Sequence, residues 1–352
     1  MTAARARKLK RLSSSPDIGS PRLSVLLPVK NAAAHLQECL KSLKFQTFFD
    51  YEIVALEHGS ADASPEILAA WAQQEPRLRI LPSLAPSLPA ALNEGLAACR
   101  GSLIARMDAD DISLPARFER QLALFDADAQ LALAGTEVEF FGDFEISEGY
   151  KNYETWVNAL RSPEAILREI FIECPLPHPS WMARREALLS LGYLDDGLPE
   201  DYQLILRAAE KGLKMAKPEG VLLRWREHPG RHSRDHGRYR RPAFMRLRAR
   251  FLKRMLIKEG PCVVWGAGDR GRLLTRLLLE EGARIESVVG WNPGGEAPVS
   301  VHGIPVISPD ELPLRLPGPL IACVGEPGVR DQIRDWAGKR NWAEGKDFWF
   351  AS

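Results

Sequence analysis

The first 110 residues alternate between apolar runs and amphipathic stretches. Leu23–Val29 and Tyr51–Leu56 are short, mostly apolar runs, which is the pattern of strands buried on both faces. Between them, Leu36, Leu40 and Leu43 recur at helical spacing. Strands that alternate with helices of about ten to fifteen residues predict βαβ units around a parallel sheet.

The same alternation continues further along the chain. Further strands are expected at 77–81, 102–107 and 131–141, helices at 62–71, 88–99 and 150–175, and a mixed α/β pattern at 180–225. Asn31 is expected to cap the helix after the first strand, and another helix is expected to start near Pro115, which Asp111 or Ser113 would cap if the acids before it are not a metal site. The predicted fold class is α/β, with a Rossmann-like sheet.

The pattern restarts after residue 260. Cys262–Trp265 is typical of a strand, the glycine turn Gly266–Gly271 follows it, and Leu273–Leu279 is typical of a helix. This order predicts a second, smaller Rossmann-like domain. The expected division is a disordered basic segment at 1–22, a first domain at 23–235, a basic helical linker at 236–259 and the small domain at 260–352.

Composition narrows the class of protein. The chain has 352 residues, of which 45% are hydrophobic and 26% charged, as in ordinary globular proteins. No run approaches the roughly 18 apolar residues of a membrane-spanning helix, and no secretory signal is recognisable. Five scattered cysteines without CxxC spacing indicate reduced thiols rather than a zinc site. We expect a cytoplasmic protein, with peripheral membrane association as an option.

The segment after the run Leu103–Ala105 carries the densest group of acids. Asp108, Asp110 and Asp111 fall within four residues, where open α/β sheets place their ligand crevice. Packed carboxylates repel one another unless a cation lies among them, and Mg²⁺ or Mn²⁺ takes oxygen ligands together with substrate phosphates. The alternative is a solvated acidic turn that caps a helix.

Further candidate residues lie at the ends of the first two expected strands. Pro28 and Asn31 lie at the end of the first strand, and Glu57 and His58 follow the second. Because the carboxyl ends of parallel strands meet at one edge of a sheet, these residues and the acids are expected to surround one bound nucleotide.

Residues 23–230 resemble the family 2 glycosyltransferases of the GT-A fold. The matching segments are Leu26–Asn31, Glu52–Asp62, Asn93–Ala97, Ala105–Asp111, Glu200–Leu204 and Arg224–His228. The resemblance implies an inverting transferase that uses a nucleotide-sugar donor and a divalent metal ion. It implies donor contacts from Pro28, Val29, Asn31, Glu57, Gly59, Arg106 and Asp108, metal ligation by Asp110 and His228, a general base at Asp201, and weaker acceptor contacts from Glu200 and His178.

Two of these positions have other interpretations. Asp201 and Glu200 follow Pro199 at the expected start of a helix, where they could serve as cap residues.

The family usually has two aspartates where this chain has Glu57 and His58, and a histidine cannot replace a carboxylate as an acceptor in the same way. A UDP-sugar is the first expectation for the donor.

The turn Gly266-Ala267-Gly268-Asp269-Arg270-Gly271 matches the spacing of a dinucleotide fingerprint. The acid expected after the next strand is missing, and Asp269 would crowd a phosphate. The glycines are therefore expected to serve the tight turn and helix–strand packing.

The two-domain layout also resembles the queuosine-tRNA galactosyltransferases, on short segments such as 153–158, 199–201 and 345–350. That resemblance implies a tRNA acceptor, which the basic stretch 231–254 would suit. A glycan or glycolipid precursor is the other acceptor class. Three rival functions remain: a nucleotidyltransferase, which would need a glycine-rich loop after the first strand, an oxidoreductase and a non-catalytic nucleotide-binding scaffold.

Overall fold

The computed structural model describes residues 19–228, 230, 237–290, 298–326 and 328–352. The predictions for residues 1–18 and 231–236 lie outside this part. The chain divides into two compact units: the first is Met1–Pro163, Leu176–Asp196 and Arg207–Arg234, and the second is Glu164–Pro175, Gly197–Leu206 and Asp235–Ser352. The boundaries expected at residues 235, 236–259 and 260 stay predictions.

A seven-stranded sheet forms the centre of the first unit, in the order β3-β2-β1-β4-β8-β6-β9. Only β8 runs antiparallel to its neighbours. The strands are β1 (Leu23–Val29), β2 (Tyr51–Glu57), β3 (Leu78–Pro82), β4 (Leu103–Arg106), β6 (Leu131–Ala134), β8 (Met182–Arg184) and β9 (Lys214–Ala216). A second sheet, β5-β10-β7, joins Ile112–Ser113, Val221–Arg226 and Glu137–Phe141.

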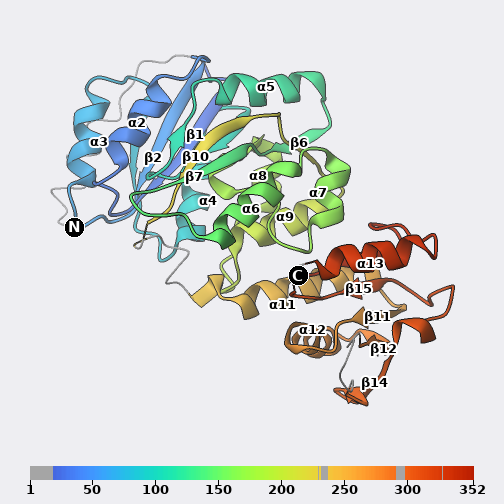
Figure 1. The fold of residues 1–352 in the computed structure, drawn as a ribbon. Coiled ribbons are helices and arrows are strands. Elements are labelled where there is room, and N and C mark those ends of the chain that lie inside the picture. The colour runs from blue at the N-terminus through green and yellow to red at the C-terminus, as the bar shows by residue number, and fades with distance from the viewer. Residues whose placement is uncertain (1–18, 229, 231–236, 291–297, 327) are drawn as a thin grey trace. The chain divides into compact units, whose positions relative to one another are not determined.

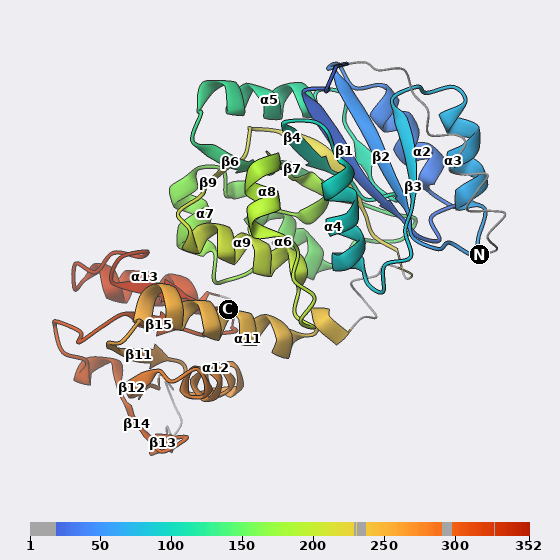
Figure 2. The same ribbon diagram turned by 180° about the vertical axis from the view of Figure 1, so that it is seen from behind.

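Helices cover both faces of the large sheet. Figures 1 and 2 show α2 and α3 on one face and α4 on the other. Alternate residues of β1 point to each face, so Leu23, Val25 and Leu27 join a core with Leu36 and Leu40 of α2. The helices are α2 (Leu36–Lys44), α3 (Ser64–Ala72), α4 (Leu88–Ala98), α5 (Arg117–Ala127), α6 (Glu148–Ala159), α7 (Pro163–Glu169), α8 (Arg185–Leu191) and α9 (Glu200–Glu210), with a short turn η1 (His178–Ser180).

The second unit is built on a six-stranded sheet in the order β13-β14-β12-β11-β15-β16. Its strands are β11 (Pro261–Trp265), β12 (Arg284–Val289), β13 (Ser300–Val301), β14 (Ile304–Ile307), β15 (Leu320–Ala322) and β16 (Phe348–Phe350). Its helices are α11 (Arg241–Leu252), α12 (Asp269–Glu280) and α13 (Val329–Gly338), with shorter turns η2 (Gly237–Tyr239), η3 (Lys253–Ile257) and η4 (Pro309–Glu311). All pairs are parallel except β13–β14.

The mixed α/β architecture with a Rossmann-like parallel sheet is as predicted, but the expected helix caps are wrong. Asn31 has a positive φ of 50°, and its side-chain oxygen accepts a hydrogen bond from Ala61 N (2.8 Å) rather than from α2. Helix α5 is preceded by Ala116, while Ser113 belongs to β5. The strand expected at 131–141 is two strands in different sheets, β6 and β7, separated by Gly135 and Thr136.

No helix within the described residues combines the length and apolarity needed to cross a membrane.

Candidate functional site

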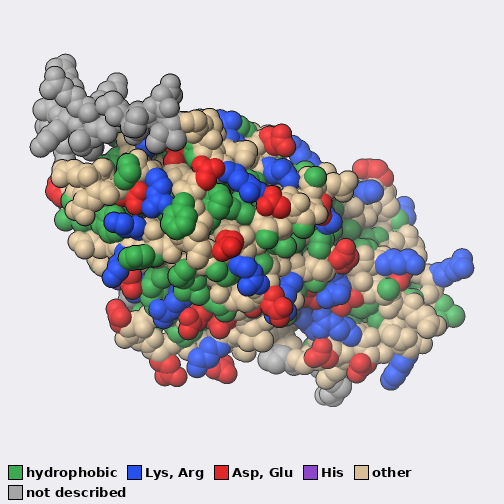
Figure 3. All heavy atoms as spheres, turned by 90° about the horizontal axis from the view of Figure 1, so that it is seen from above, with side chains coloured by type: hydrophobic (Ala, Val, Ile, Leu, Met, Phe, Trp, Pro, Cys, Tyr) green, Lys and Arg blue, Asp and Glu red, His purple; other side chains and the backbone are tan. Residues whose placement is uncertain are grey.

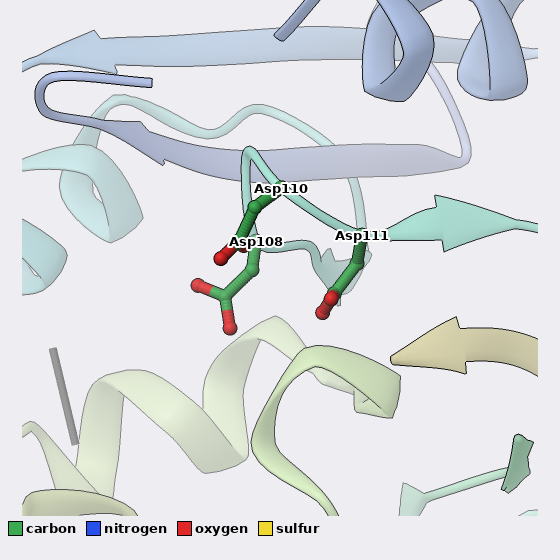
Figure 4. A group of neighbouring side chains, drawn as sticks. All are labelled: Asp108, Asp110 and Asp111. Atoms are coloured by element: carbon green, nitrogen blue, oxygen red, sulfur yellow. The ribbon is translucent and has the colours of Figure 1, made fainter. Parts of the chain in front are cut away.

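The three acids after β4 form one cluster. Carboxylate oxygens of Asp108, Asp110 and Asp111 all lie within 4.8 Å of one another. Figure 4 shows the side chains of Asp108 and Asp110 next to each other, with Asp111 set off beside the start of β5. Asp111 is almost fully buried, so the solvated acidic turn does not describe this loop.

Two buried arginines, Arg106 and Arg117, contact the acidic loop after β4. Arg106 forms an ion pair with Asp108 and is 4% exposed. Arg117 of α5 donates through Nη2 to the carbonyl of Arg106 at 2.7 Å. Burial lowers the pKa of Arg117 to about 9, and Asp111 opposes this shift. The positive charge placed beneath the acids offsets part of their mutual repulsion.

Strand β10 holds the acids from the other side. The backbone N–H of Arg226 donates to Asp111 Oδ1 at 2.8 Å, and its Nε donates to the carbonyl of Asp110 at 2.7 Å. The guanidinium of Arg226 also pairs with Glu38 of α2. Asp111 is thus held by the protein itself, which leaves Asp108 and Asp110 as the more exposed carboxylates.

His228 lies beside Asp110. Its Nε2 is 2.9 Å from Asp110 Oδ2, and its ring centroid is 5.3 Å from that of His35. Burial, Arg226 and His228 lower the pKa of His35. Two carboxylates and an imidazole are donors that suit Mn²⁺, and the carboxylates also suit Mg²⁺. The residues present therefore fit a divalent cation beside Asp108 and Asp110, with the imidazole of His228 next to Asp110.

The ends of β1 and β2 are tied together beside this loop. Val29 pairs with Glu57 in register, and its carbonyl accepts a hydrogen bond from His58 N (2.8 Å). The side chain of Val29 belongs to the core, so only its backbone is available to a ligand. Asn31 accepts from Ala61 N, and its own N–H donates to Ser60 Oγ at 3.0 Å.

Glu57 offers a buried acceptor at the end of β2. The residue is 1% exposed, and its Oε1 accepts from Ser60 N at 2.5 Å. Its Oε2 has no hydrogen-bond partner among the described residues, and such a buried atom is costly unless a ligand satisfies it. His58 instead lies with Nε2 2.6 Å from the carbonyl of Ala85. Gly59 follows with a φ of 67°, which favours glycine.

His178 lies in the same unit, close enough to Arg106 for the two to interact electrostatically. It is 7% exposed, and its Nε2 is 3.1 Å from the hydroxyl of Tyr193. Burial, with a further contribution from Arg106, places the pKa of His178 well below its usual value. His178 is therefore neutral near pH 7. The sequence pattern did not predict the contact with Tyr193.

Glu200 and Asp201 begin α9 in the second unit. The carboxylate of Glu200 is 1% exposed, accepts from Tyr239 OH at 2.7 Å and pairs with Arg238 Nη1 at 3.1 Å. Burial and Glu200 raise the pKa of Tyr239. Asp201 is the second residue of α9, more exposed than Glu200, and its Oδ1 accepts from Tyr202 N at 2.7 Å.

Known proteins resemble this chain over the part that carries the acid cluster. The model of the family described as "Glycosyl transferase family 2" matches residues 24–192. A glycosyltransferase of Haemophilus influenzae is 30% identical over 221 residues, which are 61% of this chain and 80% of the relative. The chain belongs to glycosyltransferase family 2.

Two further matches agree with this family. The amylovoran biosynthesis glycosyltransferase AmsE of Erwinia amylovora is 32% identical over 207 residues, covering 58% of this chain and 75% of AmsE. The crystal structure of S. aureus TarS residues 1–349 with UDP-GlcNAc has a TM-score of 0.52 at 15% identity, over 74% of this chain and 71% of that one. It shows the shared GT-A fold. The predicted family, fold and glycosyltransferase activity are confirmed.

The sequence pattern pointed to Arg106, Asp108, Asp110 and His228, and the structure brings these residues together. It did not reveal the residues that fix them, Arg117 and Arg226 above all. Arg226 stands two residues before His228, so its position on the same strand end was available as a signal. Arg117 offered no signal, because a single arginine at a helix start usually faces water.

Proposed function

We propose that this glycosyltransferase moves a sugar, with inversion, from a nucleotide-sugar donor to an acceptor hydroxyl, with a divalent cation at Asp108, Asp110 and His228. The observation that carries the proposal is the cluster of Asp108 and Asp110 in the loop after β4, with His228, which follows β10, placing its Nε2 2.9 Å from Asp110. When bound, the cation would withdraw charge from the leaving nucleoside diphosphate, a contribution worth several kcal/mol.

The nucleotide base is proposed to lie at the end of β2. Glu57 Oε2 is a buried acceptor without a partner among the described residues, and it can accept a hydrogen bond from a ring N–H of the base. TarS was crystallised with UDP-GlcNAc, and a UDP-sugar remains the first donor to test. The backbone of Pro28 and Val29, together with Asn31 and Gly59, would line the same end of the sheet. Arg106 and Asp108 are proposed to contact the donor sugar or diphosphate.

Asp201 is proposed as the general base. Its carboxylate would take the proton of the acceptor hydroxyl while that oxygen attacks the anomeric carbon. The bond from this carbon to the diphosphate oxygen breaks, and the nucleoside diphosphate leaves with the electron pair. A position in the first turn of α9 supports the role, because a helix fixes its residues rigidly and its positive N-terminal end stabilises the carboxylate form. Glu200 and His178 stay weaker candidates for acceptor contacts.

A glycan or glycolipid precursor is the proposed acceptor class, and a tRNA is the second candidate. Arg238 and Arg248, within the basic stretch 231–254, are buried and paired with Glu200 and Glu173. These charges are used inside the protein rather than offered to a phosphate backbone. Basic and acidic side chains are intermingled on the face in Figure 3. AmsE, a relative named for amylovoran biosynthesis, also favours a glycan.

Donor binding tests the metal site. A thermal-shift series of nucleotide sugars with and without Mn²⁺ would measure binding, since a ligand of the folded state raises its apparent stability. Asp110→Ala should abolish the Mn²⁺-dependent shift, while Glu139→Gln, which changes an exposed carboxylate of the same unit, should keep it. A full Mn²⁺-dependent shift in Asp110→Ala would remove the metal assignment.

Turnover tests the base. Asp201→Asn should keep donor binding and slow transfer by about 10²–10⁴-fold, the usual contribution of a general base. Glu210→Gln, at the other end of the same helix, is the matched control and should transfer at the original rate. Asp201→Asn with unchanged turnover would exclude this residue as the base.

A further inference from the structure

The strand order of the second unit reverses at one point, and none of the residues proposed for the transfer reaction lies at that point. The chain passes from β11 through α12 to β12 on one side of β11, and later returns to place β15 on the other side (Figure 1). The carboxyl ends of β11 and β15, at Trp265 and Ala322, therefore flank a point where the strand order reverses. Open α/β sheets bind ligands at such points.

The glycine turn at this point has two kinds of glycine. A Cβ on Gly271 would lie 1.9 Å from the carbonyl oxygen of Gly266, and one on Gly266 would lie 2.4 Å from that of Cys323. These two serve close packing, as the sequence predicted, and Gly266 also has a φ of 142°. Gly268 differs, because a Cβ there would meet nothing within 4 Å. Its backbone faces open space directly before α12.

Arg270 reaches across the reversal point. It belongs to the first turn of α12, which follows β11, while Gly325 lies three residues beyond the end of β15. A Cβ on Gly325 would come within 2.6 Å of Arg270 Cζ and Nε. The guanidinium of Arg270 thus rests against the loop after β15, with no side chain at Gly325 to displace it.

Further positive charge gathers beside Arg270. The charges of Arg248, Arg270 and Arg330 all act on Cys323, the residue directly after β15. Arg270 and Arg330 form no hydrogen bond or ion pair with any residue that the structure describes, whereas their neighbour Arg334 is paired with Glu344 at 2.8 Å. Burial lowers the pKa of Arg330, the carboxylate of Glu169 opposes this shift, and the neighbouring Arg334, Arg248 and Arg270 add to it.

Arg248 completes the group from α11. It is 6% exposed, and its Nη2 pairs with Glu173 at 3.1 Å. Its buried Nε, however, has no acceptor in the described part of the chain. Glu169 and Glu173 offset part of this charge. Gathered guanidinium groups repel one another unless anions lie among them, so the positive charge that remains at Arg270 and Arg330 favours a bound anion.

We propose that the second unit binds the diphosphate group of a small nucleotide at the carboxyl ends of β11 and β15, between the open backbone of Gly268 and the guanidinium groups of Arg270 and Arg330. A helix N-terminus and a glycine backbone bind phosphate oxygens, and arginine matches their geometry with paired N–H groups. The site is separate from the donor site of the first unit. The negative charge of Asp269 repels a bound anion, so the positive charges of Arg270 and Arg330 are required to outweigh it.

Titration calorimetry with inorganic pyrophosphate tests the charge. The full chain would carry Asp110→Ala and be kept in a metal chelator, so that the proposed donor site does not contribute. Arg270→Ala and Arg330→Ala should each weaken binding about tenfold, the loss expected for one charge-assisted hydrogen bond. Arg276→Ala, which removes an exposed charge further along α12, should leave the affinity unchanged. Absent binding, or equal binding by all variants, would overturn the proposal.

Gly268→Ala tests the backbone approach without disturbing the fold. The added methyl group has free space, so the thermal midpoint should stay close to that of the parent protein, while pyrophosphate binding should fall. ADP and NAD⁺ should compete with pyrophosphate if the ligand is a small nucleotide. Competition by a short RNA but not by ADP would overturn the small-nucleotide assignment, and undiminished binding by Gly268→Ala would overturn the proposed geometry.

Discussion

The acidic loop after β4 and the glycine turn after β11 hold equivalent places in two mostly parallel sheets. Each follows the carboxyl end of a strand that lies inside its sheet. The loop carries Asp108, Asp110 and Asp111, whereas the turn carries glycines, with Arg270 beside them. The same kind of sheet thus carries negative charge at its carboxyl edge in the first unit and positive charge at its carboxyl edge in the second unit.

The two regions also differ in how their shape is maintained. The acidic loop is held by side chains, because Arg117 and Arg226 donate to its backbone and to Asp111. The turn is held by the absence of side chains, because Gly266 and Gly271 approach to distances that no Cβ permits. A loop held by charged side chains should lose stability when one of these charges is removed. A turn held by close backbone approach should lose stability when a methyl group is added.

The largest loss of stability is expected from Asp108→Ala. Arg106 is buried and pairs with this carboxylate, and removing one partner of a buried ion pair typically costs about 3 kcal/mol or more. Urea unfolding of the variant and the parent protein would measure the difference.

The double variant Arg106→Met/Asp108→Ala is the matched control. It removes both charges together and should regain much of the lost stability, since replacing a whole buried pair by apolar groups is often close to neutral. If the double variant is less stable than Asp108→Ala alone, the ion pair is not what supports the acidic loop.

Gly271→Ala should destabilise the second unit by about 1–3 kcal/mol, the usual cost of overpacking. The upper end is expected because the new methyl group would meet a backbone carbonyl oxygen, 1.9 Å from the position that a Cβ would take. Gly268→Ala adds the same methyl group three residues earlier in open space and should lie near the parent protein. Equal thermal midpoints for the two variants would contradict the packing role of Gly271.

Much of the fold could be predicted from the sequence, because the strands of both sheets are short apolar runs with turn residues between them. β1 has the predicted bounds, and β2 extends one residue further, to Glu57. Helix starts were predicted less well. Asn31 is a good cap by residue type, yet its side chain bonds to Ala61 in the next loop, a tertiary contact that local sequence does not encode.

In the candidate site, too, some residues could be predicted from local sequence and others could not. The acids could be predicted, because three carboxylates directly after a buried strand repel one another unless a cation or positive side chains lie beside them. Their supports could not: Arg226 is 116 residues from Asp110 in sequence. The same holds for the buried contact of His178 with Tyr193, since neither residue type indicates burial by itself.

Acid should weaken the first unit through His178. Its pKa in the folded protein lies well below the usual value because the ring is buried, so below pH of about 6.5 the unfolded chain binds a proton that the folded chain does not. Stability is therefore retained above pH of about 6.5 and declines as pH falls toward the lowered pKa. The slope for one proton is at most about 1.4 kcal/mol per pH unit.

His178→Asn removes this titration while leaving an amide near Tyr193. The variant should be less stable than the parent protein at pH 7 but lose less stability between pH 7 and pH 5, as measured by urea unfolding at each pH. His302→Asn in the second unit, where the ring is exposed, is the control and should follow the parent protein. If the free energy of unfolding of His178→Asn and of the parent protein changed in parallel with pH, His178 would be protonated as readily in the folded chain as in the unfolded one. The burial of His178 near Arg106 would then not make the first unit more sensitive to acid than the second.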